Sequence, residues 1–158
     1  MREIMGKLKL TVNEEKTQIC KVPDETFEFL GYTFGRMYSP RTGLARLGYR
    51  PSKKSIRGVI EKIHVLTARK MTWQETTALV GKLNRKLRGW ANYFQVGSVS
   101  RAHRALDSYT AMRLRRWLRN KHKVRRSGGT AYPDVFLYET LRLVRLSSLK
   151  RHVPCSKA

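Results

Sequence analysis

Residues 44–66 read LARLGYRPSKKSIRGVIEKIHVL, and the spacing of their apolar side chains changes at Pro51. Residues 44–50 follow the turn-like string SPRTG and are typical of a returning strand. After Pro51, apolar side chains recur in steps of three and four, which is the period of a helix. They are Ile56, Val59, Ile60, Ile63 and Leu66. The stretch therefore predicts that a β region ends at Pro51 and that a helical region follows.

The residues before this stretch predict a small antiparallel sheet. Strands are expected over residues 7–12, 17–22 and 26–38, because polar turn residues separate them. A single strand over residues 26–38 places Phe27, Phe29 and Gly31 on one face, with Phe29 in the core. Gly31 and Gly35 are expected to mark a bend or the close approach of another backbone.

The residues after Pro51 predict four helices. Ser52 is expected to cap the first, and Thr72 with Glu75 has the spacing of a capping box that begins the second. A third helix is expected over residues 100–122, and a last one from Asp134 to about residue 146. The apolar stripe expected on the second helix comprises Trp73, Val80, Leu83, Leu87, Trp90 and Phe94.

The predicted fold class is therefore α+β. A small antiparallel β hairpin region is expected in residues 1–50, and a mainly α-helical domain is expected in residues 51–158.

The charge of the chain points to an anionic partner. The net charge is +23 over 158 residues, and 25 of the 34 Lys and Arg residues follow Arg50, with only 5 of the 11 acids. Such self-repulsion opposes compaction unless an anion binds. Nucleic acid is the first candidate partner and an anionic membrane surface is the second. No segment has the length of a transmembrane helix. Nucleic acid is taken as the partner, with no membrane and a cytoplasmic location expected.

Two cysteines, Cys20 and Cys155, provide neither a disulfide framework nor a zinc site. No metal and no cofactor are therefore expected in this chain.

The second expected helix contains the string LNRKLRGWANYF, residues 83–94, which combines aromatic side chains, cations and a glycine. Arg85, Arg88 and Asn92 fall on a line away from the apolar stripe, with Gly89 beside it. A glycine there permits the close approach of either a neighbouring helix or a phosphate backbone, and spacing alone favours neither. Trp90 is expected to be a core anchor, whereas the role of Tyr93 is left open.

The third expected helix carries a dense basic face. Its candidate anion-binding residues are Arg101, Arg104, Arg115, Arg119, Lys121 and Lys123. Residues 113–126 hold eight Lys or Arg and no acid. Like charges at helical spacing are destabilising, so an anionic partner is the favoured explanation.

Several strings resemble known segments of group II intron reverse transcriptases. LTVNEEKTQI (residues 10–19) and FEFLGYTF (residues 27–34) resemble the last two palm motifs. LNRKLRGWANYF, LRRWLRNKHK (residues 114–123) and YPDVFLYETLRLVRL (residues 132–146) resemble the maturase-specific thumb that follows. The resemblance implies an N-terminally truncated member that lacks the Tyr-x-Asp-Asp turn, whose carboxylates hold two Mg²⁺ ions in the full-length enzyme. No catalytic residue is therefore expected, and the chain alone is not expected to be an enzyme.

The resemblance also implies roles for individual residues. Lys16 matches a lysine near the incoming nucleotide, and Phe29, Leu30 and Gly31 match the primer grip. Four further residues match the thumb helix that lies along bound nucleic acid in this family: Arg85, Arg88, Gly89 and Asn92.

The implied function is binding of group II intron RNA, in splicing and intron homing, and of an RNA–DNA template-primer in a complete protein. Three alternatives remain open. The chain can be the C-terminal subunit of a split RNA-directed DNA polymerase whose separate fingers–palm chain supplies the carboxylates. It can also be a decayed fragment, or a generic basic nucleic-acid-binding protein.

Overall fold

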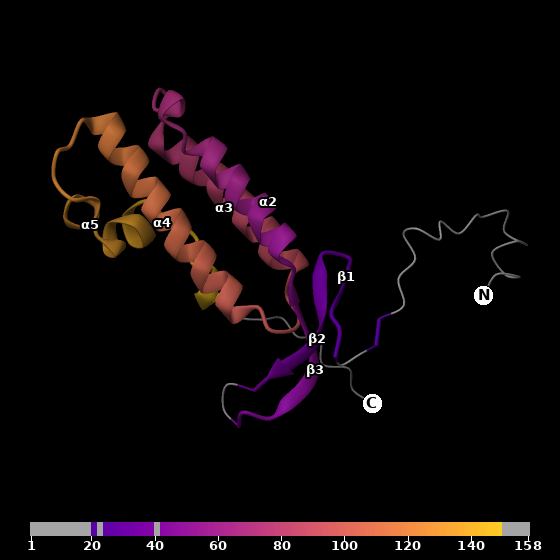
Figure 1. The fold of residues 1–158 in the computed structure, drawn as a ribbon. Helices are drawn as coiled ribbons and strands as arrows, with labels where there is room; N and C mark the ends of the chain where they lie inside the picture. Colours follow the sequence, from indigo (N-terminus) through magenta and orange to yellow (C-terminus); the bar gives the residue numbers. More distant parts are fainter. Residues whose placement is uncertain (1–19, 22–23, 40–41, 150–158) are drawn as a thin grey trace, which may run out of the picture.

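The computed structural model describes residues 20–21, 24–39 and 42–149. A three-stranded sheet lies at one end of a bundle of three long helices (Figure 1). The predicted α+β class is confirmed. The expected strand 7–12 lies outside the described residues, as do residues 17–19 and 22 of the expected strand 17–22.

The sheet is antiparallel with the strand order β1-β2-β3. Its strands are β1 (Phe27–Phe29), β2 (Tyr32–Tyr38) and β3 (Ala45–Pro51). The expectation of one strand over residues 26–38 is wrong, because the chain reverses at Leu30 and Gly31. Their φ angles are +48° and +77°, as in a two-residue hairpin turn.

The turn between β1 and β2 is held from the helical region. The Gly31 carbonyl accepts from the Ser52 amide at 2.8 Å and from the Ser55 hydroxyl at 3.0 Å. The Leu30 carbonyl accepts from the Tyr93 hydroxyl at 2.9 Å. A Cβ atom at Gly31 would lie 2.8 Å from the Ser55 Oγ, so the position requires glycine. The bend expected at Gly31 is thus confirmed, and the group that comes close to it is a side chain rather than another backbone.

The first helix, α2 (Lys53–Leu66), begins as predicted. The Ser52 Oγ accepts from the Ser55 amide at 3.1 Å, which satisfies one free amide of the first turn. Val59 and Ile63 are its buried residues, and both belong to the predicted apolar stripe.

The next helix, α3 (Thr76–Tyr93), begins later than expected. The predicted capping box is wrong, because the Thr72 hydroxyl donates to the Arg69 carbonyl at 3.0 Å and closes the short helix η2 (Arg69–Met71). Trp73 therefore precedes the helix and is 77% exposed, so its place on the apolar stripe is also wrong. The rest of the stripe is confirmed at Val80, Leu83, Leu87 and Phe94, which are buried, while Trp90 is half-buried against the core.

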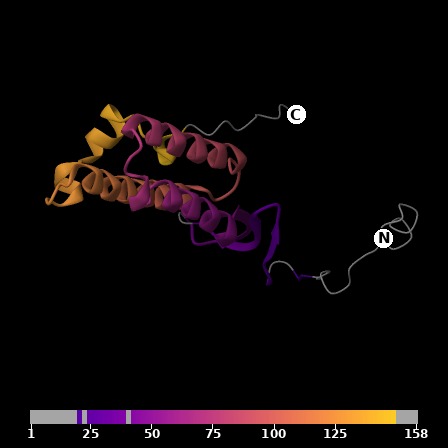
Figure 2. The same ribbon diagram turned by 90° about the horizontal axis from the view of Figure 1, so that it is seen from above.

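The third helix, α4 (Ser100–His122), matches the predicted range. It contributes Leu106, Leu114 and Trp117 to the core, where all three are fully buried. The core lies between α2, α3 and α4, which run side by side in both views (Figures 1 and 2).

The expected last helix is wrong in its extent. The chain forms α5 (Gly128–Ala131), a single wide turn η3 (Phe136–Thr140), and then η4 (Leu146–Ser148). Arg142 has a φ of +55°, which ends the helical path. Asp134, where that helix was expected to begin, pairs with Arg115 and Arg145.

Candidate nucleic-acid interface

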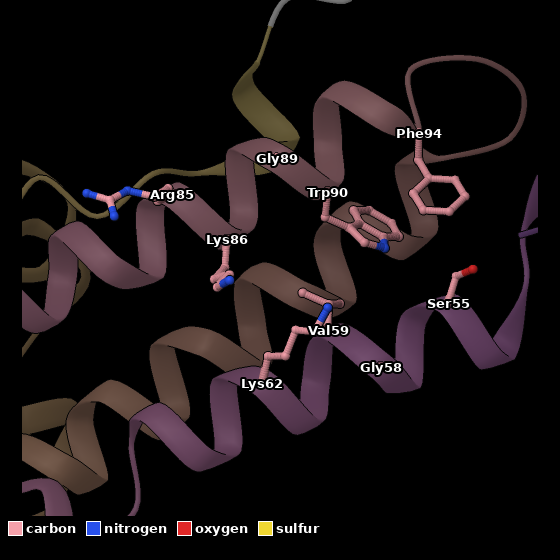
Figure 3. A pocket seen from close by; sticks show the side chains of 9 residues that line it. All are labelled: Ser55, Gly58, Val59, Lys62, Arg85, Lys86, Gly89, Trp90 and Phe94. Carbon is pink, nitrogen blue, oxygen red and sulfur yellow. The ribbon is translucent and has the colours of Figure 1, made fainter.

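A groove of about 490 Å³ runs between α2 and α3. In Figure 3, Lys62 reaches from α2 and Lys86 from α3 into the space between the two helices. Arg85 lies further along α3, with its guanidinium directed away from α2. We call this feature the α2–α3 groove; it is lined by Ser55, Gly58, Val59, Lys62, Arg85, Lys86, Gly89, Trp90 and Phe94.

The electrostatics of the groove are one-sided. Lys62, Arg85 and Lys86 are exposed, and none has an ion pair or hydrogen bond within the part of the chain that the structure describes. No carboxylate lines the groove among the residues described there. Two lysines that enter one space repel each other, and a phosphate between them relieves that repulsion. The groove is therefore suited to an anion.

The far end of the groove is apolar. The rings of Trp90 and Phe94 have centroids 4.7 Å apart and close this end near Ser55 (Figure 3). Phe94 is only 4% exposed, so it serves as a core residue, as the sequence predicts. The groove thus joins a charged middle section to an aromatic wall.

Two glycines line the groove in the interior of its helices, Gly58 on α2 and Gly89 on α3. A glycine at such a position costs about 0.5–1 kcal/mol relative to alanine. The Cβ atom of an alanine at either position would meet nothing within 4 Å in the described part of the chain. No helix described there therefore approaches Gly89, and the first of the two explanations left open by the sequence does not apply.

The predicted RNA-binding residues of α3 do not all lie in the groove. Arg85 and Gly89 line it, whereas Arg88 and Asn92 are exposed outside it. Lys62 and Lys86 were not singled out from the sequence. A signal was present, because each helix carries a glycine within one turn of a cation, at Gly58 with Lys62 and at Gly89 with Lys86.

The predicted residues of α4 separate into two groups. Arg101 and Arg104 are exposed, as is Lys123 directly after the helix. By contrast, Arg115 donates through Nε to the Tyr132 carbonyl at 2.8 Å and pairs with Asp134.

Two further predicted residues of α4 also make internal contacts. The Nζ of Lys121 donates to the Thr72 carbonyl at 3.0 Å and to the Gln74 carbonyl at 2.5 Å. Arg119 is half-buried, with its side chain near Gly128. Lys121 thus holds the segment before α3 against α4, whereas Arg119 packs beside α5.

Arg113 shows most clearly what the basic run contributes to the fold. Its side chain is buried at 8% exposure, and its Nε donates to the Thr67 Oγ1 at 3.0 Å. Its Nη2 donates to the carbonyls of Thr67 and His64, at 3.1 and 3.3 Å. These carbonyls lie at the C-terminal end of α2 and accept no hydrogen bond within the helix. A cation is favourable at this end because of the helix dipole. Part of the acid-free run thus needs no external anion.

Two polar side chains that the sequence analysis did not select hold the C-terminal segment. Asn84 donates to the Arg142 carbonyl and accepts from the Val144 amide, both at 2.8 Å. Buried Asp107 accepts from the amides of Leu146 and Ser147, at 2.8 and 2.9 Å. Their spacing alone gave no signal, because their partners are remote in the sequence.

Tyr93, left open by the sequence, connects α3 to the sheet. Besides its bond to Leu30, its carbonyl accepts from the Tyr32 hydroxyl at 3.1 Å. Partial burial raises the pKa of the Tyr32 phenol, so this hydroxyl keeps its proton at neutral pH. Burial likewise raises the pKa of Tyr138, which lies outside the groove. Tyr93 is therefore a connecting residue in this structure.

The primer-grip-like residues form the exposed β1–β2 turn. Phe29 is 60% exposed, so its expected place in the core is wrong. Leu30 is 65% exposed, and Gly31 is fixed by the contacts described above. Lys16 lies outside the described residues.

The family comparison decides the class of the helical region. The family model for "Group II intron, maturase-specific domain" matches residues 56–132. Residues 56–132 are thus similar to a group II intron maturase-specific domain. The matched residues run from within α2 to the turn after α5, so they include the whole of α3 and α4. The groove is thus built largely by the matched residues, and the match supports a role related to that of group II intron maturases. No curated protein matches the chain.

Membrane-spanning helices and metal-ligand clusters are both absent from the described residues. None of the helices described there is long and apolar enough to span a bilayer. Within the same residues, no three His, Cys, Asp or Glu side chains gather as metal ligands would.

Proposed function

We propose that the chain binds group II intron RNA, in support of intron splicing, and that the α2–α3 groove is a principal contact. The observation that carries the proposal is the set of unpaired cations Lys62, Arg85 and Lys86 around one groove of a maturase-specific domain, within the described residues. Folded RNA is recognised mainly through phosphates, 2′-hydroxyls and shape, which a basic groove can contact. Arg88, Arg101 and Arg104 are exposed outside the groove and are further cations available to RNA.

A triple variant in which Lys62, Arg85 and Lys86 are each changed to glutamine tests this proposal. The three side chains are exposed, so the melting temperature should stay close to that of the wild type. The affinity for a fluorescein-labelled group II intron transcript, measured by anisotropy, should fall. The slope of log affinity against log salt should become shallower by about 0.7–0.9 for each phosphate that the variant no longer neutralises.

The matched control replaces Arg116, Arg125 and Arg126 with glutamine, which removes the same number of exposed charges elsewhere. If both triple variants lose the same affinity, the net charge alone attracts RNA and the groove has no special role. Equal competition by transfer RNA would indicate a generic nucleic-acid-binding protein.

A second candidate function is support of an RNA-directed DNA polymerase whose fingers–palm chain, with its Mg²⁺ ions, is supplied separately. The exposed β1–β2 turn favours it, because Phe29 and Leu30 are free to contact an RNA–DNA template-primer. We expect no primer extension by the purified chain alone with Mg²⁺ or Mn²⁺. Extension by the chain, after removal of contaminating polymerase, would contradict this expectation.

A further inference from the structure

Within the described residues, alanine could replace Gly58 or Gly89 without disturbing the fold. Both lie inside long helices, where alanine is the more favourable residue. Neither contacts a neighbour that a Cβ atom would displace, since apart from the adjoining residues and the backbone of the same helix nothing described lies within 4 Å of either ideal Cβ position. What the two positions share is the groove, which both of them line. Their side-chain-free surface therefore faces space that a ligand can occupy.

We propose that the sugar–phosphate backbone of one RNA strand enters the α2–α3 groove and touches the helix backbones at Gly58 and Gly89. The two glycines set the depth of the groove, and Lys62 and Lys86 neutralise the phosphates on either side. This inference rests on the proposed function of the groove as an RNA contact. It adds which part of the RNA enters and which residues admit it.

The chemistry of the groove matches a backbone strand better than a base or a small anion. The lysine ammonium groups are compact charges that enter from opposite helices (Figure 3), as phosphates along a strand require. The wall of Trp90 and Phe94 offers an apolar surface on which a ribose can lie. Among the described residues, no carboxylate or amide side chain lines the groove to read the edge of a base.

Gly58 and Gly89, the floor of the groove, act by letting the strand come close rather than by forming strong hydrogen bonds. Gly58 and Gly89 lie in helix interiors, where backbone amides already bond within the helix. Each glycine leaves only weak Cα–H donors toward the ligand. A methyl group on the floor would hold the strand away from the helix and from the lysines, and Coulomb attraction falls with distance.

Single alanine substitutions provide the test, with a control inside α3. The test variants are Gly58→Ala and Gly89→Ala, and the control is Gly81→Ala. Gly81 is also interior to α3, and its Cβ atom would also meet nothing within 4 Å in the described chain, but it does not line the groove. Thermal melting is followed by circular dichroism, and affinity for the labelled intron transcript is measured by anisotropy at one salt concentration.

All three variants should melt higher than the wild type, by about 1–4 °C, because alanine favours the helix. Only the two groove variants should bind the transcript more weakly, each by about tenfold, because one added methyl group crowds a close contact. If these glycines had a purely structural role, the two groove variants would not gain stability and lose RNA affinity at the same time.

Four results would overturn the inference. Gly58→Ala and Gly89→Ala could bind like the wild type, or Gly81→Ala could lose as much affinity as they do. A lower melting temperature in either groove variant would assign that glycine to packing. If polyglutamate binds the wild type and both groove substitutions weaken that binding as much as they weaken RNA binding, the groove is a site for an acidic protein segment.

The charge-removing triple variant separates this inference from the proposed function. If that variant loses affinity while both glycine variants bind normally, the groove still contacts RNA but the backbone does not reach its floor. If the triple variant also binds normally, the proposed function of the groove fails together with the inference.

Discussion

Replacing Trp117 with alanine is expected to lower the free energy of unfolding by about 3–5 kcal/mol, as truncation of a buried aromatic side chain typically does. The Trp117 side chain is fully buried in the core between the helices, and the Nζ of Lys121 lies 5.2 Å from its ring centroid. A domain of this size has a total stability of about 5–15 kcal/mol. Thermal or urea unfolding followed by circular dichroism should therefore show a severely weakened or unfolded variant.

The other two tryptophans of the chain provide graded controls. Trp73→Ala should change stability by no more than about 0.5 kcal/mol, because this side chain is 77% exposed. Trp90→Ala should fall between the two, because its ring is half-buried against Phe94 and His103. If Trp73→Ala destabilises the chain as much as Trp117→Ala, the packing described above is wrong.

Replacing Arg113 with methionine is expected to lower the free energy of unfolding by about 2–4 kcal/mol. The change keeps an apolar stem but leaves the carbonyls of His64 and Thr67 without their charged donor. Each buried polar group without a partner costs about 1–3 kcal/mol. Arg113→Lys should also be destabilising, because an ammonium group cannot reproduce the fork that serves these acceptors. The measurement is the shift of the urea midpoint.

Arg116→Met is the matched control for Arg113. Arg116 lies on the same helix and is exposed, so its replacement should leave the urea midpoint nearly unchanged. If instead Arg113→Met unfolds like the wild type and loses only RNA affinity, Arg113 is an anion-binding residue and its contacts with α2 are incidental.

The parts of the fold that depend on nearby residues could be predicted from the sequence. The ranges of α2 and α4 follow from apolar side chains three and four residues apart. The Ser52 cap bonds to an amide only three residues away. Arg85 and Gly89, which line the groove, were selected as RNA-binding candidates because the helical wheel separates them from the apolar stripe.

The errors occur where remote residues decide the local structure. The segment after Thr140 has a helical pattern, but Asn84 and Asp107 bind its backbone in another conformation. The reversal at Leu30 puts a leucine at a positive φ, a strained conformation that the contacts of the turn with Ser52 and Tyr93 support.

The basic run was also interpreted too simply from the sequence. Its lack of acids suggested an external anion, but Arg113 and Lys121 donate to backbone carbonyls of other segments. Backbone carbonyls are uncharged and occur at every residue, so the sequence does not show which of them accept from these cations. Lys62 was missed because the groove needs two helices, and the wheel of one helix does not show its neighbour.

The β1–β2 turn has a consequence for the energetics of binding. Its two carbonyls are held by Ser52 and Ser55 at the start of α2 and by Tyr93 at the end of α3. Ser55 lines the groove, and Tyr93 precedes the groove residue Phe94. A ligand that displaces the turn must therefore break these bonds or move the end of the groove. If a ligand of the turn shifts the groove by this route, linkage requires the effect to be reciprocal, so occupancy of the groove would change the affinity for that ligand by the same factor.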